Sequence, residues 1–395
     1  MRALLTSPTS PGLLYPTLAL GQELLRRGHD VMLATGTSAA ERVRAAGLRL
    51  APTPASGDCG CDPGRWYKTD EVISQAGYVS SAVRSFHPQL VVGHPLTLGT
   101  YVAAELHGLP LAVLGLLVRL FPDPDCDDPQ SAAEQEQHWR LGEFTRFLNA
   151  ARQILALPAL APDARNFDGT LHLLRSVPEL DGAHRYPHAV HYVGALLGRP
   201  ARDPELETWL ATCPSDRQLI YVQPSRSFGR RNFIDAACAA FDDDAVRVVV
   251  DYARCDQPPA QWPKNFFASS SIPQHAVLPR AAAVIASGHT TTVLGALSHG
   301  RPLCLLPNGS ATDDIAQRCE RAGAATVLNV DQVDARALRT ALDGMLTRDA
   351  PQAAAQRLAR AFARVDSVPR AVDLLESVCA EAGVRTLSQP AVSTC

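Results

Sequence analysis

The sequence predicts an α/β protein of two domains, each built on a parallel sheet, and three observations support this prediction. Strand and helix patterns alternate through residues 1–115, and the same alternation resumes at residue 218. The 395 residues exceed what one hydrophobic core usually holds and suit two domains of roughly 180–200 residues each. Finally, a stretch rich in Pro, Asp and Thr at residues 200–215 has the composition of a linker.

The composition narrows the class of protein. Hydrophobic residues make up 46% of the chain and charged residues 19%, and no apolar run reaches the length of a membrane span. The net charge of −3 argues against a polyanionic partner such as nucleic acid. The chain opens on Arg2-Ala3-Leu4-Leu5, which is a strand pattern rather than an export signal. We therefore expect a cytoplasmic protein without a membrane span.

The first half of the chain alternates short apolar runs with amphipathic segments, as expected of a parallel sheet covered by helices. We expect the first domain to span residues 1–195 and the linker to span residues 196–215. The apolar runs predict strands at residues 3–5, 30–34, 89–92, 109–114, 170–174 and 190–193. The amphipathic segments predict helices at residues 16–27, 39–46, 98–106 and 141–155.

The second domain is expected at residues 216–383, followed by a tail at residues 384–395. Its apolar runs predict strands at residues 218–222, 246–251, 284–286 and 303–306, and residues 266–269 lead into the stretch that begins at Ser271. Helical spacing is present at residues 292–297, 317–322, 333–346, 353–363 and 369–382.

Neither the cysteines nor the acidic clusters predict a metal site. Ten cysteines are present, but Cys59-Gly60-Cys61 has no matching second pair, which a structural zinc site would need. Asp242-Asp243-Asp244 lies between a predicted helix and a predicted strand and indicates a loop that ends the helix. We therefore expect reduced thiols and no bound metal.

The stretch from Ser271 to Ala316 carries the clearest functional signal. Val284–Ala286 has the pattern of a short buried strand, Thr292–Leu297 has helical spacing, and Ser287–Thr292 joins the two. The backbone N–H groups and the dipole of a helix N-terminus favour an anion, and parallel sheets bind ligands at the carboxyl ends of their strands. The pattern predicts a phosphate or diphosphate site, although an ordinary strand–helix turn has the same residues.

The order of motifs in this stretch resembles the donor-binding region of GT-B glycosyltransferases. The resemblance is to the inverting, macrolide- and UDP-glucuronosyltransferase-like group that decorates antibiotics and small lipophilic molecules. That group has the motifs V-P-Q, L-P-R, H-G-G-x-G-T, A-L-x-x-G-x-P and P-Q. The corresponding residues are Ile272-Pro273-Gln274, Leu278-Pro279-Arg280, Ser287-Gly288-His289-Thr290-Thr291-Thr292, Ala296-Leu297, Gly300-Arg301-Pro302 and Pro307-Asn308. With His191-Tyr192-Val193-Gly194, the resemblance extends from Met1 to about Ala382.

The resemblance implies a GT-B fold, in which two Rossmann-like domains face each other across a cleft and the last helix crosses back to the first domain. It also implies an enzyme that moves a sugar from a nucleoside-diphosphate sugar to a small natural-product acceptor. The nucleotide would be TDP or UDP. Transfer would invert the anomeric carbon and need neither metal nor cofactor. A homodimer is also compatible with the sequence.

The resemblance assigns the donor side to two segments of the second domain. The nucleotide and phosphate residues are Ser225, Arg226, Ile272, Gln274, Ser287, Gly288, His289, Thr290, Thr291 and Thr292. Arg226 either meets a phosphate or lies in a solvated turn. The donor sugar is assigned to Asn308, Asp313 and Asp314, because the family's Asp-Gln pair is replaced by Ala311-Thr312. Asp313 and Asp314 either take over that role or cap a helix at residues 315–322.

The acceptor side follows the first strand, at Ser10, Pro11, Gly12 and Leu13. In the family this loop supplies a His that acts as general base, and Leu13 stands in the column of that His. The family's partner Asp is replaced by His94, after the strand at residues 89–92. We take His94 as the candidate base, because a strand-end His titrates near neutrality. The alternative is a His whose ring is satisfied by the backbone of a tight turn.

Because some of the family's motif residues are present and others are replaced, two classes of function are compatible with the sequence. One is an active inverting glycosyltransferase with an unusual donor, or with an acceptor that needs little base assistance, such as an amine. The other is a catalytically weakened GT-B protein that binds a nucleotide or serves as an auxiliary subunit. The changes at Leu13, Ser287 and Ala311 favour the second class, whereas Ile272-Pro273-Gln274 and the Gly-Thr turn favour the first. We take the first class as the prediction.

Overall fold

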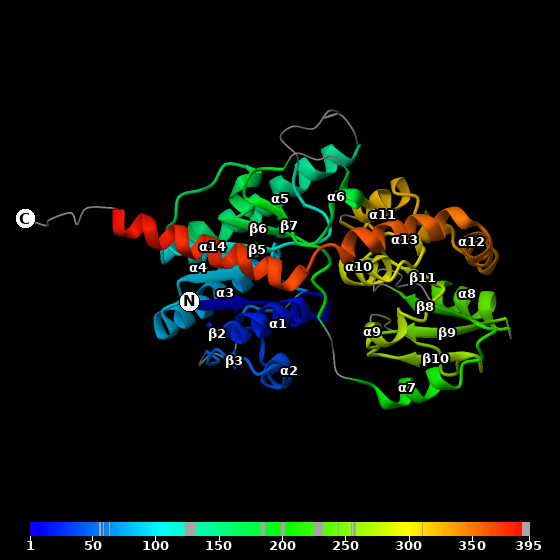
Figure 1. The fold of residues 1–395 in the computed structure, drawn as a ribbon. Coiled ribbons are helices and arrows are strands. Elements are labelled where there is room, and N and C mark those ends of the chain that lie inside the picture. The colour runs from blue at the N-terminus through cyan, green and yellow to red at the C-terminus, as the bar shows by residue number, and fades with distance from the viewer. Residues whose placement is uncertain are drawn as a thin grey trace, which may run out of the picture. The chain divides into compact units, whose positions relative to one another are not determined.

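The computed structural model describes residues 1–54, 57, 59–62, 64–122, 132–182, 186–198, 202–224, 232–243, 245–253, 255, 258–309 and 311–388. For residues 132, 133, 232 and 382–388 it describes the backbone alone. The chain divides into two compact units (Figure 1). The first comprises Met1–Arg175, His184–Gly198 and Asp366–Cys395. The second comprises Ser176–Ala183 and Arg199–Val365.

The first unit is built on a seven-stranded sheet in the order β3-β2-β1-β4-β5-β6-β7, with every described strand pair parallel. Its strands are β1 (Arg2–Thr6), β2 (Asp30–Ala34), β3 (Arg49–Leu50), β4 (Leu90–Gly93), β5 (Leu111–Leu114), β6 (Leu171–Leu174) and β7 (Val190–Tyr192). Its α-helices are α1 (Pro11–Arg26), α2 (Ala40–Ala45), α3 (Thr69–Phe86), α4 (Leu98–Leu106), α5 (Ala132–Ile154) and α14 (Ser367–Ser388). The chain order reverses between β1 and β4, which is where open parallel sheets bind ligands.

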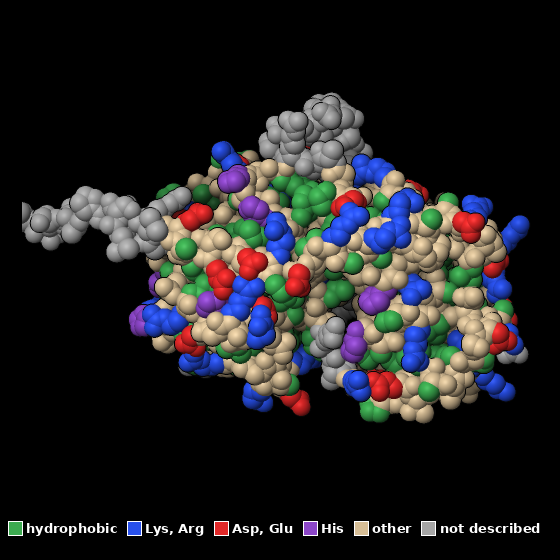
Figure 2. Space-filling model, viewed as in Figure 1, with side chains coloured by type: hydrophobic (Ala, Val, Ile, Leu, Met, Phe, Trp, Pro, Cys, Tyr) green, Lys and Arg blue, Asp and Glu red, His purple; other side chains and the backbone are tan. Residues whose placement is uncertain are grey.

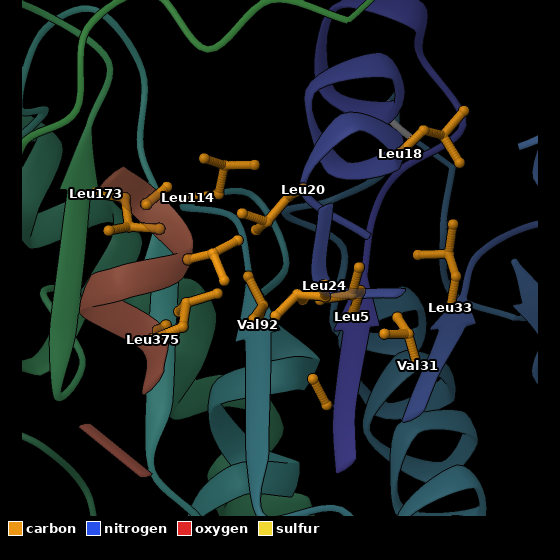
Figure 3. Close-up of a cluster of buried hydrophobic side chains, with 14 of the residues drawn as sticks. Leu5, Leu18, Leu20, Leu24, Val31, Leu33, Val92, Leu114, Leu173 and Leu375 are labelled. Atoms are coloured by element: carbon orange, nitrogen blue, oxygen red, sulfur yellow. The ribbon is translucent and has the colours of Figure 1, made fainter. Parts of the chain in front are cut away.

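The core of the first unit forms between one face of this sheet and the helices α1 and α14. Figure 3 shows Leu5 and Val92 on neighbouring strands, close to Leu24 of α1. Leu375 of α14 packs into the same cluster, near Leu114 on β5. The C-terminal helix therefore completes the core of the unit that contains the N-terminus, and Figure 1 shows it alongside α1.

The second unit is built on a six-stranded sheet in the order β10-β9-β8-β11-β12-β13, again with parallel pairs. Its strands are β8 (Gln218–Gln223), β9 (Val246–Asp251), β10 (Phe266–Ser269), β11 (Ala283–Ala286), β12 (Leu303–Leu305) and β13 (Ala325–Val327). Its α-helices are α6 (Pro178–Asp181), α7 (Pro204–Ala211), α8 (Asn232–Phe241), α9 (Gln274–Val277), α10 (Thr290–Ser298), α11 (Ala311–Arg321), α12 (Ala335–Thr347) and α13 (Asp349–Ala363). Phe241 of α8 and Leu342 of α12 pack with Val248 and Ile285 in its core.

The two parallel α/β sheets confirm the predicted fold class, but several helix starts were predicted too late, including those of α5, which begins at Ala132, and α13, which begins at Asp349. The helix predicted at residues 16–27 begins at Pro11 instead. Pro is favoured in the first turn of a helix, and Pro11 rather than Pro16 occupies that turn. Pro16 instead lies inside α1. The helix predicted at residues 317–322 begins at Ala311, so Asp313 and Asp314 lie in its first turn.

On the face of the molecule that Figure 2 shows, the charged residues do not gather by sign. On the face shown in Figure 2, Lys and Arg side chains are interspersed with Asp and Glu side chains rather than collected in one basic patch. Within the described part of the chain, no helix combines the length and the apolar character that crossing a membrane requires.

Candidate functional site

The predicted phosphate site lies where β11 ends and α10 begins. Ser287 and Gly288 follow the strand, and His289 is the N-cap residue of α10, with no capping hydrogen bond from its own side chain among the described residues. Gly288 has φ +87, a conformation that suits glycine, and a Cβ added there would lie 3.1 Å from the Thr312 carbonyl oxygen. The glycine thus lets the turn pass close to the start of α11. The first-turn N–H groups of α10 lie at the carboxyl edge of the sheet, as the sequence predicted.

A network of buried polar side chains joins α10 to the strand ends beside it. Gln223, at the end of β8, accepts a hydrogen bond from Thr292 Oγ1 and donates from Nε2 to Asp251 Oδ2 over 3.1 Å. Gln274 Nε2 donates to Thr292 Oγ1 over 3.1 Å and to the Tyr221 hydroxyl over 3.2 Å. The Tyr221 hydroxyl lies 3.4 Å from Asp251 Oδ2, which closes the ring. The network fixes the first turn of α10 against β8 and β9.

The structure also locates two residues that the sequence assigned to the nucleotide, Gln274 and Ile272. Gln274 begins α9, and its side-chain amide lies against Tyr221 and Thr292. Ile272 is buried, with 6% of its surface exposed. The sequence could not find Gln223 and Asp251, because their partners are distant in the chain. Their positions at the polar ends of apolar strands are the one local signal that they give.

Ser287 occupies the column of the family's pyrophosphate His. It is buried, and its hydroxyl has no hydrogen-bond partner among the residues that the structure describes. His289 is partly buried at the N-cap, and Thr290 to Thr292 form the first turn of α10. The hydroxyl of Thr292 is held by the network described above. Ser225 and Arg226, which the sequence also assigned to the phosphates, lie outside the described residues.

The residues assigned to the donor sugar lie around the start of α11. Asn308 is exposed, and its backbone N–H donates to Thr312 Oγ1 over 3.1 Å. Thr312 Oγ1 in turn donates to the Gly309 carbonyl over 2.8 Å. Asp314 is buried and Asp313 is partly exposed, both within the first turn of α11. Carboxylates in a first turn are stabilised by the helix dipole, which corrects the idea that these two residues precede the helix as caps.

In the first unit, His94 follows β4 and is 1% exposed. Its backbone N–H donates to Thr97 Oγ1 over 2.8 Å, and Thr97 Oγ1 lies 2.8 Å from the His94 carbonyl oxygen. On the ring, Nε2 lies 2.8 Å from Thr17 Oγ1, which is itself 2.9 Å from the Leu13 carbonyl. Because Thr17 has one hydroxyl hydrogen, it either donates to Nε2 or accepts from it while donating to Leu13.

Burial decides the charge of this histidine. Removal from water, together with the Arg175 guanidinium, lowers the pKa of His94 to about 3, and the Leu114 backbone carbonyl opposes the shift. The ring is therefore neutral at physiological pH. It can accept a proton in principle, but a base with so low a pKa is weak.

The predicted acceptor loop forms the start of α1. Ser10 is the N-cap residue, Pro11 and Gly12 are in the first turn, and Leu13 is 8% exposed. Arg175, which the sequence analysis did not single out, follows β6 and is fully buried. Its Nη1 lies 3.5 Å from the Gly12 carbonyl, and its Nε lies 3.3 Å from the Ala195 carbonyl. The sequence signal was weak: a single Arg directly after an apolar strand.

A shallow depression, partly open to solvent, lies beside this loop in the first unit. Pro8 of the β1–α1 segment and Leu96 of the β4–α4 segment contribute to its wall, together with Trp66 and Gln75. These two segments are the ones that carry Ser10 and His94. Among the described residues, no three His, Cys, Asp or Glu side chains are arranged so that they could hold a metal ion.

Comparison with known sequences places this geometry in context. Residues 233–376 match the family model described as erythromycin biosynthesis protein CIII-like, C-terminal domain. The 4'-demethylrebeccamycin synthase of Lentzea aerocolonigenes is 24% identical over 420 residues, covering 95% of this chain and 99% of that protein. The L-demethylnoviosyl transferase of Streptomyces niveus is 27% identical over 391 residues, covering 92% of this chain and 94% of that protein.

Solved structures extend the comparison. The glycotransferase of kitacinnamycin superposes with a TM-score of 0.73 at 19% identity, covering 95% of this chain and 98% of that one. The glycosyltransferase VinC in complex with dTDP superposes with a TM-score of 0.69 at 20% identity, covering 96% and 100%. At these identities the likeness establishes the fold, which is GT-B.

Proposed function

We propose that this chain, a glycosyltransferase of the GT-B fold, moves a sugar from a TDP- or UDP-sugar to a small natural-product acceptor. Transfer inverts the anomeric carbon and needs no metal. One observation carries the proposal: a glycine turn at the carboxyl edge of a parallel sheet presents the N-terminus of α10, a helix of nine residues. The relatives that align over nearly their whole length are natural-product transferases, which supports the same class of acceptor.

The donor half of the proposal rests on electrostatics. A diphosphate that accepts hydrogen bonds from the backbone N–H groups of His289 to Thr292 lies at the positive end of the helix dipole. The same groups stabilise the charge that develops on the leaving diphosphate, which is why the reaction needs no metal in this proposal. VinC, a similar protein solved with dTDP, supports thymidine diphosphate as the first nucleotide to test.

The acceptor half rests on the first unit, with the Ser10–Leu13 segment beside the acceptor. His94 is the group that we assign as base for an acceptor that attacks through a hydroxyl. Its ring is neutral, and the hydrogen bond from Thr17 Oγ1 to Nε2, or the reverse, links it to the α1 segment. Because the pKa of the ring is low, we expect His94 to contribute only weakly to the rate as a general base.

The donor proposal is tested first by thermal shift with dTDP, UDP and GDP on the full chain. A nucleotide at about 100 times its Kd should raise the free energy of unfolding by about 2.7 kcal/mol. Stabilisation by dTDP or UDP supports the proposal. The absence of any shift with all three nucleotides contradicts it.

The reaction is tested by following dTDP or UDP release from the sugar nucleotides that bind, with a panel of phenolic, carboxylic and amine acceptors. The rate should be unchanged in EDTA, and a loss that added Mg²⁺ restores would contradict the metal-independent mechanism. The coupling constant of the anomeric proton in the product reports the stereochemistry. A product with the donor's anomeric configuration would contradict inversion.

A further inference from the structure

Five buried arginines lie in the described part of the chain, and four of them face a carboxylate. The pairs are Arg119–Asp168, Arg140–Glu136, Arg152–Glu105 and Arg318–Asp181. Arg175 is fully buried as well, but no carboxylate of the described residues pairs with it. A buried cation without a counter-charge is costly, so proteins seldom keep one without a use for it.

The contacts of Arg175 satisfy only some of the hydrogen-bond donors of its guanidinium. Nε donates to the Ala195 carbonyl over 3.3 Å, and Nη1 donates to the Gly12 carbonyl over 3.5 Å. The second contact has a local reason, because Pro16 has no N–H to donate to the carbonyl four residues before it. Both distances are at the long end of the hydrogen-bond range. Nη2 has no hydrogen-bond partner in the described structure.

The surroundings of Nη2 favour an anion. Arg175 follows β6 and His94 follows β4, so both lie at the carboxyl edge of the same sheet. The Gly12 carbonyl belongs to the first turn of α1, a helix of 16 residues whose N-cap Ser10 makes no side-chain cap. A guanidinium beside the N-terminal turn of a helix adds its charge to the helix dipole.

The chemistry of the acceptor gives this positive site a use. A hydroxyl must lose its proton as it attacks, and Leu13 has no proton acceptor while His94 is a weak base. A carboxylic acid, with a reference pKa near 4, is already ionised at neutral pH. A carboxylate therefore needs a cation to hold it and no base to activate it.

We propose, given the glycosyl transfer proposed above, that the acceptor is a carboxylic acid bound as its carboxylate by Arg175, and that the product is a glycosyl ester. One carboxylate oxygen attacks the anomeric carbon and forms the new C–O bond. The bond between the anomeric carbon and the diphosphate oxygen breaks, and its electron pair leaves with the nucleoside diphosphate. No proton is transferred, and nothing is oxidised or reduced. The carboxylate replaces the long contact between Nη1 and Gly12 and also binds Nη2.

The test uses the full chain and matched pairs of probes. Benzoate, 4-hydroxybenzoate and cinnamate are compared by calorimetry with benzyl alcohol, 4-hydroxybenzyl alcohol and cinnamyl alcohol, in the presence of dTDP. Each carboxylate should bind more tightly than its alcohol. Arg175→Met should weaken carboxylate binding by roughly 10- to 100-fold, the effect of losing a charged hydrogen-bond partner. Arg175→Lys, which keeps the charge but not the fork of donors, should recover part of that loss.

Arg119→Met serves as the matched control, since Arg119 is also buried but forms two hydrogen bonds to Asp168. It should lower the melting temperature and leave carboxylate binding of the folded protein unchanged. If Arg175 only supports the Gly12 and Ala195 carbonyls, Arg175→Met will lower the melting temperature without changing carboxylate binding, and the proposal is overturned. It is also overturned if no carboxylate binds a protein that binds dTDP.

The product of 4-hydroxybenzoate with the sugar nucleotide that binds gives a second, independent reading. A glycosyl ester is cleaved by hydroxylamine, whereas a phenolic glycoside is stable to it. An ester supports the proposal, and a glycoside formed on the phenol overturns it while leaving the proposed glycosyl transfer intact. If wild type binds neither dTDP nor UDP, the donor proposal itself has failed, and the two failures are thereby distinguished.

Discussion

The carboxyl edges of the two sheets differ in how their polar groups are satisfied. In the second unit, Gln223, Thr292 and Gln274 share hydrogen bonds in a ring closed by Tyr221 and Asp251. In the first unit, the corresponding edge carries two buried ionisable groups instead. Burial lowers the pKa of His94 to about 3 and that of Arg175 to about 9.

In the proposed function, this difference distinguishes the donor-binding edge of the second sheet from the acceptor-binding edge of the first sheet. A fully hydrogen-bonded network holds the first turn of α10 in one position, which suits a ligand whose diphosphate is always the same. Buried groups with lowered pKa values are energetically costly and gather where a protein uses them. Within the function proposed above, we therefore assign donor binding to the second unit and the acceptor chemistry to the first unit.

The largest expected effect is at His94. With an acceptor that reacts through a hydroxyl, His94→Ala should lower kcat by roughly 10²-fold, the low end of the usual contribution of a general base, because a ring with so low a pKa is a weak base. With a carboxylate acceptor the loss should stay below about 10-fold, because no proton is removed. Affinity for dTDP should not change in either case. Full activity of His94→Ala on a hydroxyl acceptor would eliminate His94 as the base.

The next effect tests the network of the second unit. Thr292→Val removes the hydroxyl that Gln223 and Gln274 share, and should cost roughly 1–3 kcal/mol of unfolding free energy because two partly buried amides lose a partner. Thr291→Val is the matched control on the same helical turn, where the side chain is partly exposed. Chemical denaturation measures both. Equal stabilities for the two variants would show that the network does not hold α10.

A smaller effect is expected from pH. The folded-state pKa of His94 lies below its reference value of 6.5. Between these two pKa values the unfolded chain binds a proton at His94 and the folded protein does not. The contribution of the neutral His94 ring to the free energy of unfolding is fully present above pH 6.5, and it is lost as the pH falls from 6.5 toward 3. At pH 5 the loss should be on the order of 2 kcal/mol. Denaturation of wild type and His94→Gln at pH 7.5 and pH 5 measures it, and an unchanged difference in the variant contradicts this origin.

The sequence was sufficient for most of the strands and for the start of α10, because short apolar runs and a Gly-containing turn are local signals, but no strand was predicted at β13. It did not predict α3, whose buried face includes the polar residues Glu71, Gln75 and Ser80 and so lacks a clean apolar stripe. Arg175 belongs to no motif, and its meaning comes from the absence of a carboxylate partner, which is a property of the fold. Gln223 and Asp251 likewise meet Thr292 and Tyr221 only in three dimensions.

The central claim is that the nucleotide diphosphate binds at the N-terminus of α10, and the pair Thr291→Asp and Thr291→Asn tests it most directly. The two side chains have nearly the same shape and differ by one negative charge at the second residue of the helix. Calorimetric titration with dTDP should show a Kd roughly 10- to 100-fold weaker for the Asp variant than for the Asn variant, through repulsion of the diphosphate. Raising the salt concentration should narrow the gap. Equal affinities in the two variants would contradict the assignment and place the nucleotide elsewhere.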